Sequence, residues 1–231
     1  MAEQKVSYSL NARLSVCQTA CMQAIEELGW QLMEQRDSYI LTKRPSDLWR
    51  RSVTIQIMFE SSSQDTTVIT YSGSMFGIGP IITGAIKDTI SDAQKKLEVY
   101  ALSIAFGYLR VSRVTYLGGH PLMPNSTQAL IGLSNENFVI HSLADMSTCS
   151  IPLLTIVKVG TGKPKTAREV YNEDRGYTID VIEHSPFLSV AFELDKYPYI
   201  ASFEEFSDAT PQEWANQITA VQYQLRKRQA P

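Results

Sequence analysis

Residues 210–225 read TPQEWANQITAVQYQL, and this stretch decides the fold expected for the second half of the chain. Thr210 and Glu213 stand three residues apart around Pro211, the spacing of a capping box with proline at the first helical position. Apolar residues follow at helical spacing: Trp214, Ile218, Val221 and Leu225. The sequence therefore predicts a capped amphipathic helix close to the C-terminal end of the chain.

Short strands are expected upstream of this helix, from Val111 to Phe203. Apolar and polar residues alternate in three of these segments, whose apolar members are Ala129, Ile131 and Leu133; Tyr177, Ile179 and Val181; and Leu188, Val190 and Phe192. Residues 134–137 predict a tight turn, and Ile151–Val159 is expected to continue the sheet. About seven strands at this spacing favour a barrel or sandwich, here followed by one helix.

Three segments of this half carry a family resemblance. They are YLGGHP at 116–121, ALIGLSNENFVIHSL at 129–143 and SIPLLTIVKV at 150–159, the last with an I-P-x-x-x-I strand. Together with the terminal helix, residues 113–228 resemble bacterial pleckstrin-homology-like (PH-like) and GRAM-like domains. The resemblance implies a β-barrel capped by the helix, a scaffold that presents loops to protein or lipid partners and has no inherent catalytic activity.

The clearest strand signal of the first half is Val53–Phe59, where Val53, Ile55, Ile57 and Phe59 alternate with polar residues. A strand is expected at Lys5–Leu10, a helix with its apolar face from Leu14 to Leu28, and a long helix from Ile82 to about Gly107. With two further hairpin strands, the order is β-α-β4-α. This order predicts a sheet with both helices on one face.

The first half also resembles a small uncharacterised bacterial α+β module of the helix-grip or cystatin-like type. The matching residues are LNARLSVCQTACMQAIEELGWQLMEQRDSYILTKRP at 10–45, with a helix ending in LGW, and SGSMFGIGPI at 72–81. The expected fold class is therefore α+β in two domains, residues 1–110 and residues 111–231. Such folds hold ligands or partners more often than they perform chemistry.

Composition and charge narrow the functional classes. Hydrophobic residues make up 44% of the 231 residues, which is sufficient for real cores, and the formal net charge is only −3. No nucleic-acid partner is expected at this charge. The sequence shows no membrane-spanning stretch and no secretory signal, and its three cysteines form no disulfide framework. We expect a cytoplasmic protein, with a peripheral membrane location left open.

The densest basic cluster is the candidate partner-binding site, since cations beside an aromatic ring can grip a phosphate, a headgroup or an acidic loop. Its members are Lys43, Arg44, Trp49, Arg50 and Arg51. A weaker anion- or lipid-binding site is expected around a later loop, at Lys158, Lys163, Lys165 and Arg168. The alternative for the first cluster is a solvated loop, and the acidic turn at 134–137 argues against inositol phosphates.

Other reactive residues have structural interpretations. Cys17 and Cys21 fall on the apolar helix face and are expected in the core, without a metal site. His120, His141 and His184 show no ligand spacing, and the glycines at 73, 77 and 79 match no phosphate-binding motif. The sequence predicts no catalytic residue, no metal and no cofactor.

Three functional hypotheses follow. The first is a non-enzymatic adaptor or scaffold that binds a protein or peptide partner. The second is a peripheral membrane protein that binds anionic lipid, through the Arg50 region and the turn near Phe76 and Ile78. The third is a small-ligand cavity in the N-terminal domain, which would need convergent polar groups. Homo-oligomerisation is left open.

Overall fold

The computed structural model describes residues 2–46, 51–77, 79–162, 165–172, 177–184, 187–207 and 209–229, and for 165–172 and 177–184 it gives the backbone alone. The chain forms two compact units, Met1–Tyr108 and Leu109–Pro231, each described by itself below. The predicted α+β class is confirmed, with one large antiparallel sheet in each unit and a C-terminal helix.

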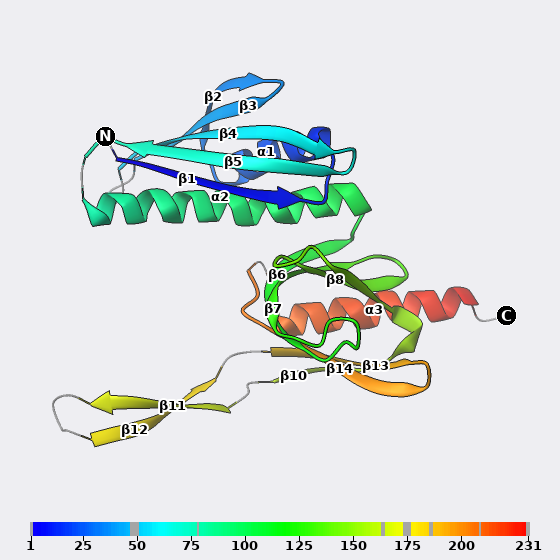
Figure 1. The fold of residues 1–231 in the computed structure, drawn as a ribbon. Coiled ribbons are helices and arrows are strands. Elements are labelled where there is room, and N and C mark those ends of the chain that lie inside the picture. The colour runs from blue at the N-terminus through cyan, green and yellow to red at the C-terminus, as the bar shows by residue number, and fades with distance from the viewer. Residues whose placement is uncertain are drawn as a thin grey trace. The chain divides into compact units, whose positions relative to one another are not determined.

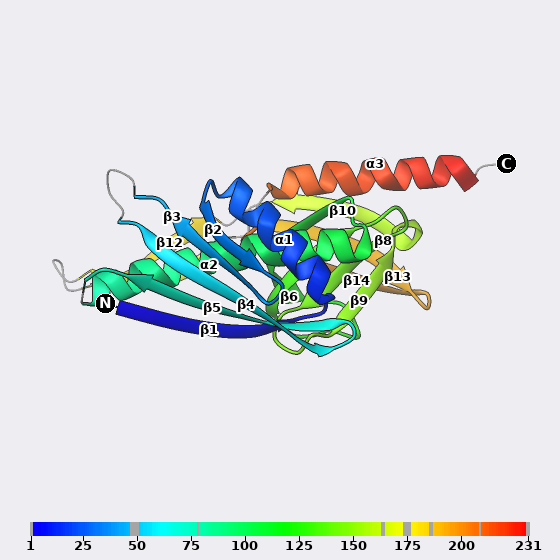
Figure 2. The same ribbon diagram turned by 90° about the horizontal axis from the view of Figure 1, so that it is seen from above.

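The first unit has the predicted β-α-β4-α order. Its elements are β1 (Ala2–Leu10), α1 (Leu14–Glu27), β2 (Gln31–Arg36), β3 (Tyr39–Arg44), β4 (Val53–Ser63), β5 (Thr66–Met75) and α2 (Pro80–Phe106). The strands pair antiparallel in the order β1-β5-β4-β3-β2 and fan out side by side in Figure 2. Strand β1, the first in sequence, therefore forms one edge and pairs with β5.

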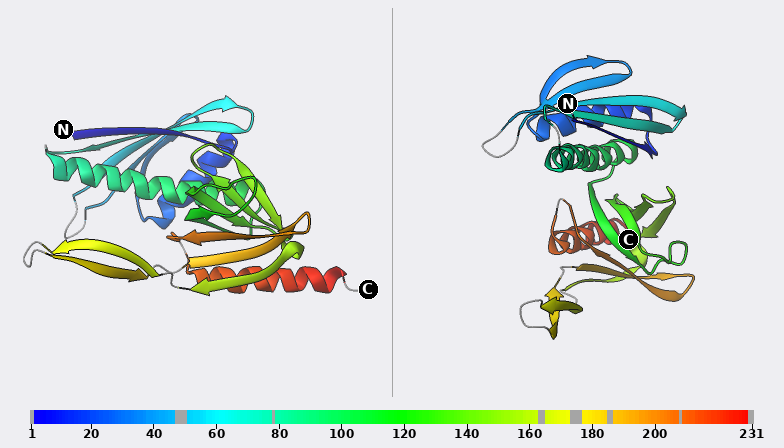
Figure 3. Two further views of the ribbon diagram at one scale, coloured as in Figure 1. Left: turned by 60° about the horizontal axis from the view of Figure 1, so that its bottom comes forward. Right: turned by 60° about the vertical axis from the view of Figure 1, so that its left-hand side comes forward.

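Both helices pack on one face of this sheet, as the end-on view of α2 in Figure 3 shows. Val53, Ile55 and Ile57 of β4 are buried against them, because alternate side chains of a strand point to the same face. Close approach of α2 depends on Gly73, where a Cβ would lie 2.5 Å from Ile86 Cγ2. The glycine therefore lets the long helix lie directly on β5.

The second unit contains more strands and one helix. Its elements are β6 (Arg110–Gly118), β7 (Thr127–Leu133), β8 (Asn137–Ser142), β9 (Thr148–Pro152), the 3₁₀ turn η1 (Leu153–Thr155), β10 (Ile156–Gly162), β11 (Lys165–Asn172), β12 (Tyr177–His184), β13 (Phe187–Leu194), β14 (Tyr197–Glu204) and α3 (Pro211–Gln229). Figure 1 shows their arrangement. The stretch Ile151–Val159 is thus two strands rather than one, separated by the 3₁₀ turn that follows Pro152.

The main sheet of this unit has the order β10-β13-β14-β6-β7-β8-β9, and β11 pairs with β12 separately. Its first strand, β6, pairs with its last, β14, through Ser202↔Gly118 and Phe203↔Tyr116. Helix α3 contacts β10, β13 and the 3₁₀ turn. One core results, shared by the sheet and the helix.

The predicted capping box of α3 is confirmed. The Thr210 N–H donates to Glu213 Oε2 at 3.0 Å, and the Glu213 N–H donates to Thr210 Oγ1 at 3.2 Å. Two otherwise unpaired N–H groups are satisfied by this exchange. Trp214 and Ile218 on the next turns are fully buried, as the apolar stripe predicts.

Candidate functional site

Two tyrosines lie side by side on the helix-facing side of the first sheet. Tyr8 is on β1 and Tyr71 on β5, and the register pairs Val6 with Tyr71 and Tyr8 with Ile69, so the tyrosines are diagonal neighbours. Their rings stack with centroids 6.1 Å apart and planes 5° from parallel. This tyrosine pair, defined as Tyr8 and Tyr71, places two phenol groups together in the interior of the unit.

The hydroxyls of the tyrosine pair are buried and have no hydrogen-bond partner outside the pair among the described residues. Tyr71 is fully buried, and Tyr8 is half-buried as a residue. Neither hydroxyl oxygen is exposed; each interacts with the other hydroxyl of the pair, and neither has a further hydrogen-bond partner among the residues that the structure describes. A buried unsatisfied polar group costs about 1–3 kcal/mol. Two such groups side by side are an unusual feature of a core, and they call for an explanation.

The environment keeps both phenols protonated. Burial raises the pKa of Tyr8 well above its usual range, and the neighbouring Tyr71 and the charge of Glu98 raise it further. Burial also raises the pKa of Tyr71, with smaller contributions from Cys21 and Glu98. Each tyrosine therefore offers an O–H donor at neutral pH. The pair can donate to an oxygen atom of a ligand but cannot act as a phenolate.

The cysteines beside the pair are buried in the core, as the sequence predicted. Cys17 and Cys21 lie on the face of α1 that packs on the sheet. Burial raises the pKa of Cys17 to about 11 and the pKa of Cys21 to about 12. No group of three or more metal-ligating side chains occurs among the residues that the structure describes. These thiols are not activated nucleophiles, since only the thiolate reacts readily.

We expect the thiols of the folded protein to react slowly with Ellman's reagent. Burial also raises the pKa of Cys149 to about 11, so all three thiols share the same protection. At about pH 8 the thiolate fraction falls by roughly 100-fold relative to an ordinary cysteine. Absorbance kinetics of the thiol reaction in buffer and in denaturant would measure the difference in rate between the folded and unfolded chain. If one thiol of the folded protein reacts as fast as it does in denaturant, that cysteine is exposed to solvent and the prediction is wrong for it.

Two adjoining hollows lie on the opposite, helix-free face of the same sheet. Their volumes are about 470 and 400 Å³, and both are lined by Lys5. Cross-strand rows supply the polar lining, with Lys5, Ser72 and Gln56 in one row. This face is polar and open to solvent, as one face of an antiparallel sheet commonly is.

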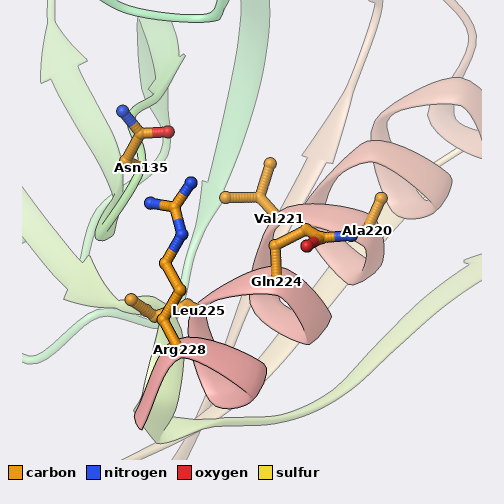
Figure 4. A pocket seen from close by; sticks show the side chains of 6 residues that line it. All are labelled: Asn135, Ala220, Val221, Gln224, Leu225 and Arg228. Atoms are coloured by element: carbon orange, nitrogen blue, oxygen red, sulfur yellow. The ribbon is translucent and has the colours of Figure 1, made fainter.

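A smaller hollow lies in the second unit, between α3 and the turn from β7 to β8 (Figure 4). Val221 and Leu225 supply its apolar side, while Asn135 and Arg228 approach each other across it. Its volume of about 190 Å³ is below the roughly 300–1,000 Å³ of most small-molecule sites. We therefore interpret this hollow as a small groove beside α3 and not as a small-molecule site.

The structure describes three of the five residues of the predicted basic cluster. Lys43 and Arg44 end β3, and Arg51 is exposed just before β4, whereas Trp49 and Arg50 lie outside the described residues. The Arg44 guanidinium donates to Thr89 Oγ1 at 2.8 Å and to the Arg51 carbonyl at 2.9 Å. Arg44 thus ties the sheet to α2, and this structural role was not foreseen.

The second predicted basic group is described only in part. Lys158 is exposed on β10. Lys165 and Arg168 belong to β11, whose side chains are outside the description, and Lys163 lies outside it altogether. These residues therefore stay a prediction.

Two histidines belong to the core of the second unit. The ring of His120 stacks on Phe192 at 5.5 Å, and His141 Nδ1 lies 3.0 Å from Thr148 Oγ1. Both are buried, which lowers the pKa of His120 and lowers the pKa of His141 to about 4. The side chain of His184 is outside the described residues.

The depressed pKa of His141 predicts acid sensitivity of the second unit. Below about pH 6.5 the unfolded chain binds a proton that the folded His141 refuses, so stability falls as the pH drops toward 4. The loss reaches about 3 kcal/mol when the shift is fully expressed. Urea denaturation across this range would show a shallower pH dependence for His141→Gln than for wild type. If the free energy of unfolding depends on pH equally in both proteins, His141 is not the cause of the acid sensitivity.

The comparisons with known proteins give only distant likenesses. No protein-family model and no curated protein matches the chain. A solved structure of DynU16, from the dynemicin biosynthetic locus, is 10% identical over 88% of this chain and 86% of that chain, with a TM-score of 0.35. The di-domain ARO/CYC proteins BexL, from the BE-7585A pathway, and StfQ, from the steffimycin pathway, are 8% and 6% identical. They cover 99% and 97% of this chain and 95% and 96% of their own, with TM-scores of 0.29 and 0.28.

These comparisons correct the functional prediction. The predicted non-enzymatic adaptor that binds a protein or peptide partner is contradicted: the similar structures are of proteins from biosynthetic loci and pathways. The prediction inferred the lack of activity from the lack of a catalytic motif. TM-scores this low transfer no activity to this chain, so its own residues must support a function.

Proposed function

We propose that the first unit binds a small molecule in its helix–sheet interior, with an oxygen atom of that molecule accepting hydrogen bonds from Tyr8 and Tyr71. The observation that supports this most directly is the burial of both hydroxyls with no hydrogen-bond partner outside the pair among the described residues. A ligand oxygen placed between them would satisfy two donors at once. Binding would then recover the cost that the two groups impose on the empty protein.

The surroundings of the tyrosine pair restrict the ligand chemistry. The core that contains Tyr71 is otherwise built mainly from aliphatic side chains and the thiols of Cys17 and Cys21. A ligand that fits there is largely apolar and carries one oxygen acceptor, such as a phenolate or a conjugated carbonyl. Small-molecule sites typically have an apolar lining with a few polar groups that fix the orientation of the ligand.

Strand β1 offers the route of entry. It is an edge strand of the sheet, and its Tyr8 is half-buried as a residue while the hydroxyl is buried. A small displacement of this edge would admit a flat molecule between the strand and the helices. Edge strands hold fewer backbone hydrogen bonds than central ones, so they open at lower cost.

The donors would also favour negative charge on the bound oxygen. Two O–H groups in an apolar interior stabilise a phenolate or enolate more than they would in water, which is the principle of an oxyanion hole. An enzymatic role would use the pair in this way, to polarise a carbonyl and stabilise the enolate derived from it. The raised pKa values keep the donors protonated throughout the neutral range.

Titration with para-nitrophenolate tests the proposal, since its visible absorbance shifts on transfer into an apolar site with donors. We expect saturable binding to wild type and affinity about 10- to 100-fold lower for Tyr8→Phe and for Tyr71→Phe, because each loses a hydrogen bond to a charged acceptor. Tyr100→Phe is the matched control, since the Tyr100 hydroxyl donates to Glu27 instead. Unchanged affinity in both Tyr8 and Tyr71 variants would refute the proposal, as would no binding by wild type.

Two further expectations stay proposals. We infer a PH-like barrel for the second unit, supported by a seven-stranded order in which the first strand pairs with the last and a capped helix follows. A crystal structure without the β6–β14 pairing would refute it.

We also infer a cytoplasmic location, supported by three free, buried cysteines. Recovery in an oxidising fraction with these thiols disulfide-bonded would contradict it.

A further inference from the structure

The two most exposed large apolar side chains of the described residues share one turn. Phe76 and Ile81 are each 87% exposed; Phe76 directly follows β5, and Ile81 lies in the first turn of α2. No helix among the described residues combines the length and apolar character needed to cross a bilayer.

Two glycines of this connection adopt backbone conformations with positive φ. Gly77 and Gly79 have φ values of 130° and 123°, which side chains rarely permit. A Cβ on Gly77 would overlap the Ile82 side chain, so Ile82 lies beneath the turn. Ile82 packs on the core, whereas its neighbour Ile81 points to solvent. The turn is anchored from below and presents two large apolar groups outward.

A cation lies beside Gly77, the residue that follows Phe76. The nearest Arg51 guanidinium nitrogen is 3.5 Å from the position that a Gly77 Cβ would occupy. Arg51 is exposed, and its carbonyl is held by the Arg44 guanidinium at 2.9 Å. Arg44 also binds Thr89 on α2 at 2.8 Å, so it fixes the start of β4 against the helix. The position of Arg51 next to the turn is thus built into the fold.

We propose that the turn defined by Phe76, Gly77, Gly79 and Ile81 inserts its two apolar side chains into the headgroup region of an anionic bilayer, with Arg51 at the level of the phosphates. A pair of projecting side chains offers too little area for a stable protein interface, which needs about 1,000 Å² or more. A bilayer needs no matching surface, and a cation behind the apolar groups fits its negative headgroups. The contact is reversible, because two side chains anchor weakly.

Vesicle flotation of the full chain tests this inference. We expect the chain to float with vesicles of mixed phosphatidylglycerol and phosphatidylcholine, and the double variant Phe76→Ser with Ile81→Ser to bind about 100-fold more weakly, about 10-fold per apolar side chain. Arg51→Glu should bind about 10-fold more weakly and show less dependence on salt. All three positions are exposed, so the variants are expected to fold, and circular dichroism would check this.

Val157→Ser is the matched control, since Val157 is a similarly exposed apolar residue, at 67%, on β10 of the other unit. Its binding to vesicles should equal that of wild type. Undiminished flotation of the double variant would overturn the inference, and so would an equal loss in the control. If sedimentation without vesicles shows a dimer that only the double variant lacks, the turn binds a second copy and the bilayer assignment fails. Binding of para-nitrophenolate should be unaffected in every variant, which separates this inference from the proposed function.

Discussion

Replacing Trp214 by alanine should remove about 3–5 kcal/mol from the free energy of unfolding of the second unit. Trp214 is the largest fully buried side chain. Its ring meets Phe138 edge-on with centroids 5.9 Å apart, and its indole N–H donates to Ser112 Oγ at 3.0 Å. The variant leaves a large cavity and an unpaired buried hydroxyl, so two costs add.

Urea denaturation of the full chain, followed by circular dichroism, would measure this loss. Tyr223→Ala is the control, because Tyr223 lies on the same helix but is 63% exposed, and it should change stability by less than about 0.5 kcal/mol. Trp214→Phe should lie between the two, because it retains most of the ring volume. A loss for Trp214→Ala as small as that of the control would mean that α3 does not pack on the sheet as described.

The second large effect is expected at Gly119, where alanine should destabilise the second unit by about 3 kcal/mol or more. Gly119 has φ 108°, and a Cβ there would overlap the backbone carbonyl oxygen of Ile200 on β14. Backbone cannot yield as a flexible side chain can, so the pairing of the first and last strands of the sheet would be disrupted.

Thermal unfolding of Gly119→Ala would be compared with that of Gly29→Ala. Gly29 also has a positive φ, 65°, but nothing lies within 4 Å of the position of its Cβ. The Gly29 variant should therefore show only the conformational cost, about 1 kcal/mol. Equal effects at the two glycines would show that the close approach of Gly119 to β14 is absent.

Local signals in the sequence were sufficient for much of the fold. The alternation from Val53 to Phe59 and the apolar spacing of Trp214 and Ile218 follow from strand and helix geometry, so the elements could be placed. The capping box of Thr210 and Glu213 is also local, and its two hydrogen bonds have the expected partners. Such features depend on residues within a few positions of one another.

The candidate site depends on distant residues and could not be predicted in this way. Tyr8 and Tyr71 are 63 positions apart, and they become neighbours because β1 pairs with β5. Tyr8 shares its strand face with Val6 and Leu10, which indicates that this face is buried but does not show whether the hydroxyl has a hydrogen-bond partner. Arg44 shows the reverse case, since its bonds to Thr89 and the Arg51 carbonyl give a residue expected at the surface a structural role.

The stability of Tyr71→Phe in the absence of ligand tests the central claim most directly. If the Tyr71 hydroxyl is buried with no partner beyond the weak contact to Tyr8, its removal relieves a desolvation cost that is not compensated, and the first unit should become more stable by about 1 kcal/mol in urea denaturation. A loss of about 1 kcal/mol or more would show that the hydroxyl is already hydrogen-bonded within the protein. The tyrosine pair would then have no donor to spare for a ligand, and the account of the first unit as a small-molecule site would be contradicted.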